Sequence, residues 1–381
     1  MDSPPSSAHP RPFQPLPAGA VTLVALALAA AVPFAVYSPA LAPRPAPPTP
    51  PVPSTPATGA ATRTQAPLGP LPQLLSQTGF ADGSNLAYSP QYPLWSDGAS
   101  KRRFVSIPRG ESIDAQDPDD WQFPSGTRFW KEFSFGERVE TRYLEKLPDG
   151  SFRFASYAWD PALGDSVLVP EAGLRNAHDL GRGVAHDIPS RSDCLACHEG
   201  RRSLVLGFNA LQLSPDRDPL AVHGEPLPPT AVDLRELIER GLLRNFPREL
   251  LQPAPRIAAT SPTARAAQGY LFGNCSGCHN ARGPLAAVGL DFDQPVRGER
   301  RALSSSVSVP SNFRIPGAAG SLRVAPGKPQ QSVAWFRMNV RGGAQMPPLG
   351  TKLVDHAGTA LIARFIARDV SPTPSHQKKA E

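Results

Sequence analysis

The chain changes its hydrophobic patterning from short alternating runs in the first half to helical spacing in the second. Between about residues 85 and 170, runs rich in aromatic and β-branched residues stand between turn residues, at 103–107, 127–130, 139–144 and 152–159. The last two are separated by residues 148–151, Pro-Asp-Gly-Ser, a typical hairpin turn. We therefore expect a β-rich domain over residues 73–180, folded as a small sandwich or barrel. Its core is expected to contain Trp95, Trp121, Trp130 and Trp159.

Helical spacing appears later in the chain. Apolar residues recur at intervals of three and four in the segments 230–240, 263–272, 331–340 and 355–367, and the first of these stops at Gly241. The sequence therefore predicts an α+β protein in which an α-rich region follows the β-rich domain. The polar residues 371–381 are predicted to form a disordered tail.

Two segments before the β-rich region do not have the composition of a folded domain. Residues 18–42 are apolar and uncharged and end in Ala40-Leu41-Ala42, which is typical of a signal-peptidase site. The apolar run is also long enough to cross a bilayer. Residues 1–42 are therefore predicted to be a signal peptide or a membrane anchor, with cleavage favoured. Residues 43–72, dominated by Pro, Ala and Thr, are predicted to form an extended linker.

Composition narrows the possible partners. With 40% hydrophobic residues the chain of 381 residues can form a core, whereas 47 Pro and 31 Gly exclude a mostly helical protein. The 39 Lys and Arg against 33 Asp and Glu give a net charge of +6, but the basic residues are scattered along the chain. We therefore expect no nucleic acid partner.

All four cysteines fall into two copies of one motif, Cys194-Leu195-Ala196-Cys197-His198 and Cys275-Ser276-Gly277-Cys278-His279. In such a motif both thiols can form thioethers with the vinyl groups of a porphyrin, and the adjoining His can bind its iron. A four-cysteine zinc site or structural disulfides would leave the two histidines unexplained. A thioredoxin-type pair would need only one motif, within a βαβ unit. The sequence therefore predicts two covalently bound haem c groups, with His198 and His279 as iron ligands.

A distal ligand for the second haem can be predicted from the methionines, which are Met1, Met338 and Met346. Met346 lies in a loop after His279, where Pro347 biases it towards an extended conformation. This loop, with a helix before Cys275 and another from Asp355, resembles the class I cytochrome c fold. Residues 256–370 are therefore predicted to be a class I cytochrome c domain with Met346 as distal ligand. Met338 better fits a role in the core.

The first haem-binding segment, residues 181–255, leaves its sixth iron ligand open. No methionine lies between His198 and the second motif, and the nearest histidines are His178, His186 and His223. Of these, His186 and His223 are the better candidates, and a five-coordinate iron is the other option. A free position could bind peroxide or oxygen, whereas a second histidine would give an electron carrier of lower potential.

Several further segments resemble a family of poorly characterised diheme c-type cytochromes from Gram-negative bacteria. The resemblance spans roughly residues 85–370, and it implies export to the periplasm, attachment of two haems and electron transfer, but no particular substrate. The protein would then be soluble in the periplasm or tethered to the inner membrane. The matching landmarks are 92–103 (YPLWSDGASKRR), 123–127 (FPSGT), 188–193 (IPSRSD), 206–213 (LGFNALQL), Asn274 and 346–350 (MPPLG).

Electron transfer between redox partner proteins is the leading interpretation of these features. His/Met ligation would raise the potential of the second haem, so electrons would flow from the first haem to the second. One alternative is a diheme peroxidase or oxidase with an open site at the first haem. Another is that the β-rich region binds a partner or a sugar-like ligand, with the haem region as its relay. No carboxylate pair, Ser-His-Asp pattern or phosphate-binding loop indicates hydrolysis or nucleotide use.

Overall fold

The computed structural model describes residues 69–80, 83–318 and 320–370. All of them belong to one compact unit, Thr64–Glu381. The predicted signal peptide or anchor (1–42), residues 43–68 of the predicted linker and the predicted tail (371–381) lie outside the described residues. Within the described ranges, no helix combines the length and the apolar character needed to cross a membrane.

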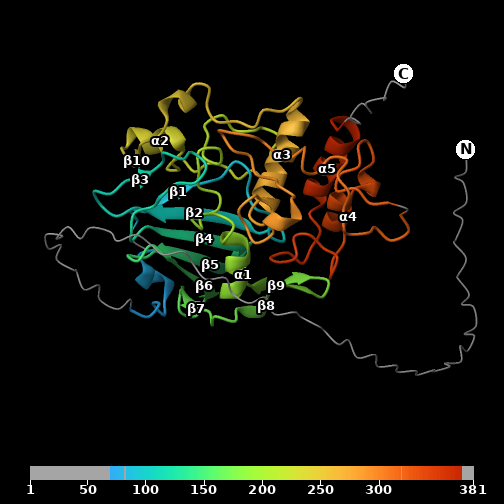
Figure 1. The fold of residues 1–381 in the computed structure, drawn as a ribbon. Coiled ribbons are helices and arrows are strands. Elements are labelled where there is room, and N and C mark those ends of the chain that lie inside the picture. The colour runs from blue at the N-terminus through green and yellow to red at the C-terminus, as the bar shows by residue number, and fades with distance from the viewer. Residues whose placement is uncertain (1–68, 81–82, 319, 371–381) are drawn as a thin grey trace, which may run out of the picture. The chain divides into compact units, whose positions relative to one another are not determined.

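A six-stranded antiparallel sheet occupies the first half of the described chain, in the order β1-β2-β4-β5-β6-β7 (Figure 1). The predicted strand segments fall in β2, β4, β5 and β6, and residues 148–151 join β5 to β6 as expected. The strands are β1 (Leu86–Tyr88), β2 (Ser100–Ser106), β4 (Arg128–Phe135), β5 (Glu137–Lys146), β6 (Phe152–Asp160) and β7 (Asp165–Leu168).

This sheet is open, so the predicted barrel is wrong. Its edge strands β1 and β7 contain only three and four residues and do not pair with each other. Each edge instead forms a single bridge to another segment, Ala87 to Ala231 and Leu74 to Val167. Two small two-stranded sheets complete the β structure: β3 (Ile113–Asp114) with β10 (Leu243–Arg244), and β8 (Leu174–Gly181) with β9 (Val184–Ile188).

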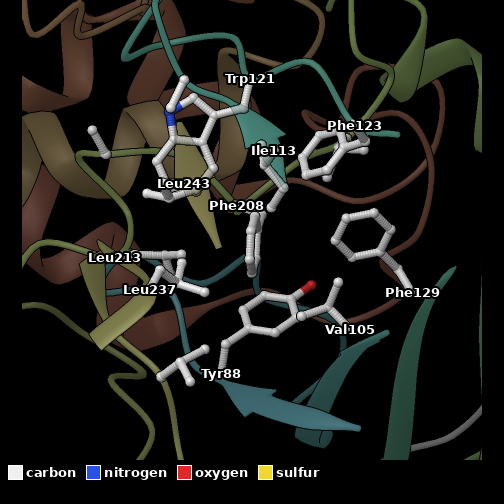
Figure 2. Close-up of a cluster of buried hydrophobic side chains, with 14 of the residues drawn as sticks. Tyr88, Val105, Ile113, Trp121, Phe123, Phe129, Phe208, Leu213, Leu237 and Leu243 are labelled. Atoms are coloured by element: carbon white, nitrogen blue, oxygen red, sulfur yellow. The ribbon is translucent and has the colours of Figure 1, made fainter. Parts of the chain in front are cut away.

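The two faces of the sheet belong to different hydrophobic clusters, because side chains alternate along each strand. On one face Trp130, Tyr143 and Tyr157 pack with Leu75 of the 3-10 helix η1 (Leu75–Thr78). On the other face Phe129 belongs to a larger cluster with Phe208 at its centre (Figure 2). The Phe208 ring lies between 4.7 and 6.0 Å from the rings of Tyr88, Trp121, Phe123 and Phe129.

The tryptophans only partly follow the prediction that all four fill the core of the sheet. Trp121 and Trp130 are each 1% exposed and do so. Trp159 instead lies half-buried under the Arg138 guanidinium, 3.5 Å from the ring centroid. Trp95 is half-buried beside the second Cys-x-x-Cys-His motif, away from the sheet core, as described below.

Helices follow the sheet as expected, and all four predicted helical segments are confirmed. Helix α3 starts where the Ser261 hydroxyl accepts a hydrogen bond from the Ala264 amide, and α5 where the Asp355 carboxylate accepts one from Gly358. Figure 1 shows α3 alongside α5. The helices are α1 (Arg191–His198), α2 (Leu234–Glu239), α3 (Pro262–Cys275), α4 (Val333–Asn339) and α5 (His356–Arg368), with 3-10 helices at Arg248–Leu251, Ala286–Val288 and Pro329–Gln331.

The second half is nevertheless less helical than the sequence pattern predicts. Helix, with the 3-10 helices included, accounts for 21% of the described residues, the same share as strand. Most of the chain between α3 and α4 consists of turns and bends, apart from two single-turn 3-10 helices. Proline and glycine recur throughout this segment, and both residues disfavour helix interiors.

Candidate functional site

Helix α1 carries the first Cys-x-x-Cys-His motif. A reciprocal cap begins it, in which the Ser190 hydroxyl accepts from the Asp193 amide (3.1 Å) and the Asp193 carboxylate accepts from the Ser190 amide (3.0 Å). Cys194 and Cys197 are then three residues apart on one helix and lie on the same side of it. The landmark segment 188–193 therefore has a local role, because it starts the helix that orients both thiols.

The His198 side chain has the environment of a metal-binding imidazole. Burial, aided by the positive charges of Lys131 and Arg142, lowers the pKa of His198 to about 4, so its ring is neutral. Its Nδ1 lies 2.6 Å from the Leu204 carbonyl oxygen, to which a neutral ring donates its proton. Nε2 is then left with a free lone pair, as in histidines that ligate a metal. The Phe154 ring packs edge-on against the imidazole at 5.2 Å.

The second motif begins at the last residue of α3 and continues into a tight turn. Cys275 ends the helix, and its carbonyl accepts hydrogen bonds from the Cys278 and His279 amides at 3.2 and 2.9 Å. Burial, together with the Arg337 and Arg323 charges, lowers the pKa of His279. Its Nδ1 is buried and has no hydrogen-bond partner among the described residues. Such an orphaned nitrogen is costly unless another group satisfies it.

The fold brings the two motifs into direct contact. The Sγ atoms of Cys197 and Cys278 lie 4.0 Å apart, and Cys278 Sγ also donates to the Ala196 carbonyl at 3.4 Å. Two glycines permit this approach, because a Cβ atom added to Gly200 would lie 2.2 Å from the Gly277 carbonyl oxygen. The contact joins segments far apart in the chain, so neither motif predicts it from its own sequence.

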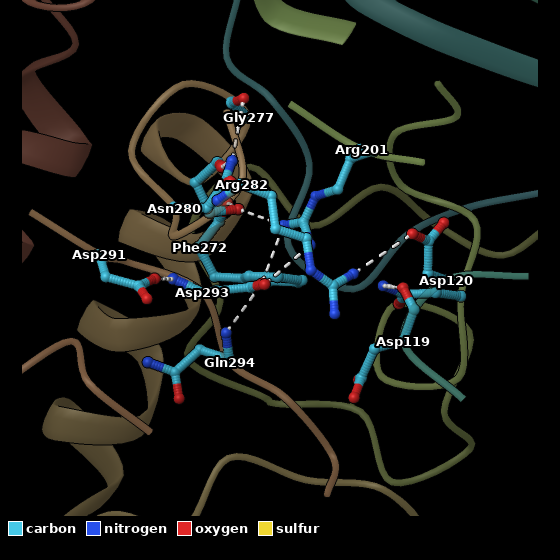
Figure 3. A network of polar contacts seen from close by, with 12 residues as sticks. Asp119, Asp120, Arg201, Phe272, Gly277, Asn280, Arg282, Asp291, Asp293 and Gln294 are labelled. Atoms are coloured by element: carbon cyan, nitrogen blue, oxygen red, sulfur yellow. Dashed lines mark hydrogen bonds and ion pairs between the residues drawn. The ribbon is translucent and has the colours of Figure 1, made fainter. Parts of the chain in front are cut away.

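A polar network fixes the chain segments that leave the two motifs (Figure 3). Arg201, three residues after His198, forms a bidentate pair with Asp293 (both 2.9 Å) and donates to the Ser276 hydroxyl within the second motif (2.9 Å). Asn280, directly after His279, donates to the Ser276 carbonyl and accepts from the Arg282 and Gly283 amides. The sequence alone did not single out Arg201 or Asn280, because neither residue belongs to a recognisable motif.

The zinc and disulfide alternatives find little support in this geometry. The thiols of Cys197 and Cys278, the second cysteine of each motif, are in contact. The described residues nevertheless contain no group of three or more His, Cys, Asp or Glu arranged to hold a metal ion. All four cysteines are free thiols. Burial raises the pKa of Cys275 to about 12 and also raises that of Cys194, so the first thiol of each motif disfavours the thiolate that zinc or a redox thiol requires. The hydrogen bond with Cys197 instead lowers the pKa of Cys278.

Met346 lies beside the helix that carries the second motif. It lines a small cavity of about 20 Å³ together with Trp95, Asn274 and Met338. Asn274, the residue before Cys275, accepts a hydrogen bond from the Trp95 amide at 2.8 Å. The cavity therefore brings both internal methionines, and a tryptophan that was expected in the sheet core, next to the second motif.

The histidines considered for the first haem are held by carboxylates. His186 is 1% exposed, with Nε2 3.0 Å from Glu140 and Nδ1 3.5 Å from Asp97. Burial opposes protonation of His186, but its hydrogen bonds to Asp97 and Glu140 outweigh that effect and raise its pKa. Both ring nitrogens are therefore engaged.

His223 and His178 also differ from what a ligand of the first haem requires. Nε2 of His223 lies 2.8 Å from Asp355, a residue that lines the Met346 cavity, so this histidine belongs to the surroundings of the second motif. His178 stacks on Phe135 at 5.1 Å and lies 3.7 Å from Glu137. His186 thus has both ring nitrogens engaged by carboxylates, whereas His223 and His178 each have one nitrogen near a carboxylate.

Comparison of the chain with protein-family models, curated proteins and solved structures finds no match. The geometry of the two motifs and their surroundings is therefore what points to a function.

Proposed function

We propose that the protein is an exported diheme c-type cytochrome that transfers electrons between redox partner proteins. Haem would be attached at Cys194 and Cys197 and at Cys275 and Cys278. The observation that carries this proposal is the contact between the two Cys-x-x-Cys-His motifs, in which the sulfur atoms of Cys197 and Cys278 lie 4.0 Å apart. A zinc site, a disulfide or a redox thiol would use the cysteines but leave a buried, neutral histidine after each pair without a role.

The residues at and around the two motifs fit haem chemically. His198 and His279 would bind iron as neutral imidazoles, and the Leu204 carbonyl would fix the ring of His198 in the required tautomer. Phe154 and Phe292, whose rings lie edge-on to these imidazoles at 5.2 and 6.2 Å, would exclude water. Haem supplies the one-electron chemistry when bound. Met346 is the proposed distal ligand at the second motif.

The close sulfur contact gives the chain an internal route for electrons. Cys197 and Cys278 are the second cysteines of their motifs, so each would be bonded to the edge of its own porphyrin. A Met346 thioether would raise the potential of the second centre above that of the first. Electrons would then enter at the His198 centre and leave from the His279 centre towards a partner protein.

A second candidate function, a diheme peroxidase or oxidase, is favoured by one specific observation. Both nitrogens of His186 and Nε2 of His223 are engaged by carboxylates, which leaves the first iron without an evident sixth ligand. Peroxide-dependent oxidation of a reduced donor, with a high-spin ferric signal assigned to the His198 centre, would support this function over simple electron transfer.

The decisive experiment is to produce the full chain in a bacterium that matures c-type cytochromes in its periplasm. We expect red protein in the periplasmic or inner-membrane fraction, two haems per chain by pyridine haemochrome, and a mass increased by two haems. The double variant Cys275→Ala/Cys278→Ala should retain one haem. Colourless protein with the mass of the bare chain would overturn the proposal.

A further inference from the structure

One face of the six-stranded sheet carries a buried row of cations. In the register of the sheet, Arg103 of β2 lies opposite Lys131 of β4, which lies opposite Arg142 of β5. Lys101, two residues before Arg103, points to the same face because side chains alternate along a strand. Lys101 and Arg103 are 8% and 5% exposed, and the other two side chains are half-buried. Four cationic side chains therefore share one inner surface.

Only half of this positive charge is paired within the chain. Arg103 pairs with Glu225, and Arg142 pairs with Glu140, which also contacts His186. Lys131 has no carboxylate partner among the described residues, and the Lys101 ammonium donates to the Ala99 carbonyl at 2.9 Å. Burial and the neighbouring cations hold the pKa of Lys131 well below its usual value and lower that of Lys101 to about 8. An unpaired ammonium in such a position is costly and calls for an anion.

The row lies beside the first motif. Phe154 of β6, which packs against the His198 ring at 5.2 Å, is two residues from Ser156 on the same face. Ser156 lies directly opposite Arg142 in the register of β5 and β6. Diagonal neighbours of this kind are about 7 to 8 Å apart across a sheet. The cations are thus next to the surface that the His198 imidazole faces.

Apolar residues occupy the same face next to the cations. Val105, Phe129, Leu144 and Phe154 follow one another across β2, β4, β5 and β6, one row away from Arg103, Lys131 and Arg142. Val105, Phe129 and Leu144 are covered by the cluster around Phe208, whereas Phe154, at the end of the row, reaches the His198 ring. An apolar side chain beside a row of cations at this end suits the edge of a flat apolar molecule that carries carboxylates. A porphyrin with its two propionates has this character, and its two negative charges equal in number the two unpaired ammonium groups.

We propose that Lys131 and Lys101, supported by Arg103 and Arg142, bind the propionate carboxylates of the haem attached at Cys194 and Cys197. The inference rests on the proposed function, because it requires that haem be attached there. It goes beyond that function because it assigns a role to the face of the sheet that carries these four cations. This face would form one side of the haem site. A free carboxylate or inorganic anion is the other source of the same chemistry.

The test compares Lys131→Gln, Lys131→Arg and Lys101→Gln with the control Lys146→Gln in the haem-loaded protein. Lys146 belongs to the same sheet, as the last residue of β5, but its ammonium donates to the exposed Gly150 carbonyl at the end of the sheet. Haem count, the midpoint potential of each centre and the resonance Raman bending mode of the propionates are measured. We expect both Gln variants to keep two haems, to shift the propionate mode and to lower the potential of the first centre only. Lys131→Arg and Lys146→Gln should match the wild type.

Each other outcome has a distinct meaning. Two haems with an unchanged propionate mode and potential in both Gln variants would overturn the inference and leave the proposed function intact. A wild-type protein without haem would instead overturn the proposed function. If added acetate or phosphate changes the spectrum of the wild type but not of Lys131→Gln, the row binds an external anion, and the propionate assignment is wrong. Should Lys131→Gln fail to fold, Lys101→Gln tests the same assignment independently.

Discussion

The chemistry of each histidine depends on which atoms surround its ring. His198 and His279 are surrounded by apolar groups and positive charges, and burial keeps both imidazoles neutral. His186 is buried more deeply than either, at 1% exposed, but it lies between two carboxylates, which favour its protonated form. Because a metal binds only the neutral ring, these environments separate the two proposed iron ligands from a histidine that holds the fold together.

The methionines allow a prediction at the same scale. Met346 and Met338 line one cavity, so the replacement of each by Leu changes the available sulfur while almost conserving volume. We expect Met346→Leu to abolish the near-infrared charge-transfer band of thioether ligation and to lower the potential of the second centre. Met338→Leu should keep both and cost less than about 1.5 kcal/mol of stability. If Met338→Leu alone removed the band, the assignment of Met346 would be wrong.

Contact between α1 and the turn after α3 is the decisive feature at the scale of elements, and it depends on glycine. A Cβ at Gly200 would meet the Gly277 carbonyl oxygen at 2.2 Å and Asn280 Nδ2 at 2.9 Å, and the carbonyl cannot move without moving the second motif. Neither glycine needs a left-handed conformation, so the constraint is the close approach itself.

We therefore expect Gly200→Ala to push the two motifs apart. The loss of stability should be about 1 to 3 kcal/mol, as for other overpacked sites, measured by denaturant unfolding. The exciton splitting of the Soret circular dichroism, which reports on two close haems, should weaken. Gly320→Ala is the control, because a Cβ there meets nothing within 4 Å. Full splitting in Gly200→Ala would mean that the motif contact does not set the distance between the haems.

How much could be predicted from the sequence also differs from element to element. Strands β2, β4, β5 and β6 and helices α3 and α5 were predictable, because alternation, helical spacing, turn residues and caps are local signals. The role of the motif cysteines in haem attachment, inferred from their spacing, stays a prediction. Whether the sheet closes into a barrel was not predictable, since it depends on what covers the short edge strands. Arg201, Asn280, Lys131 and Trp95 became candidates only when the fold brought distant segments together.

At the scale of the whole molecule, one segment connects the sheet to the helical half. Tyr92 packs with Leu211, Ile257 and Phe272, and Gly269 of α3 makes room for its ring. Five residues later, Asp97 accepts hydrogen bonds from the Lys352 and Leu353 amides at 2.7 and 2.9 Å through one oxygen, while its other oxygen faces His186. The landmark 92–103 therefore lies where the sheet, α3 and the Met346 loop meet.

The connection predicts that the two halves unfold together and that Asp97 couples them. Asp97→Ala removes both hydrogen bonds to residues 352 and 353 and places Ala at a φ of 51°, which only a few residue types tolerate. We expect a loss of about 3 kcal/mol and a broader transition, followed by tryptophan fluorescence and by the Soret band in parallel. Asp97→Asn tolerates the same φ and keeps an acceptor oxygen, so it should lose much less and stay cooperative. Equal losses of stability in the two variants would instead assign the stabilisation to the ion pair with His186. If the fluorescence and Soret transitions were sharp and coincident in both variants, Asp97 would not couple the halves.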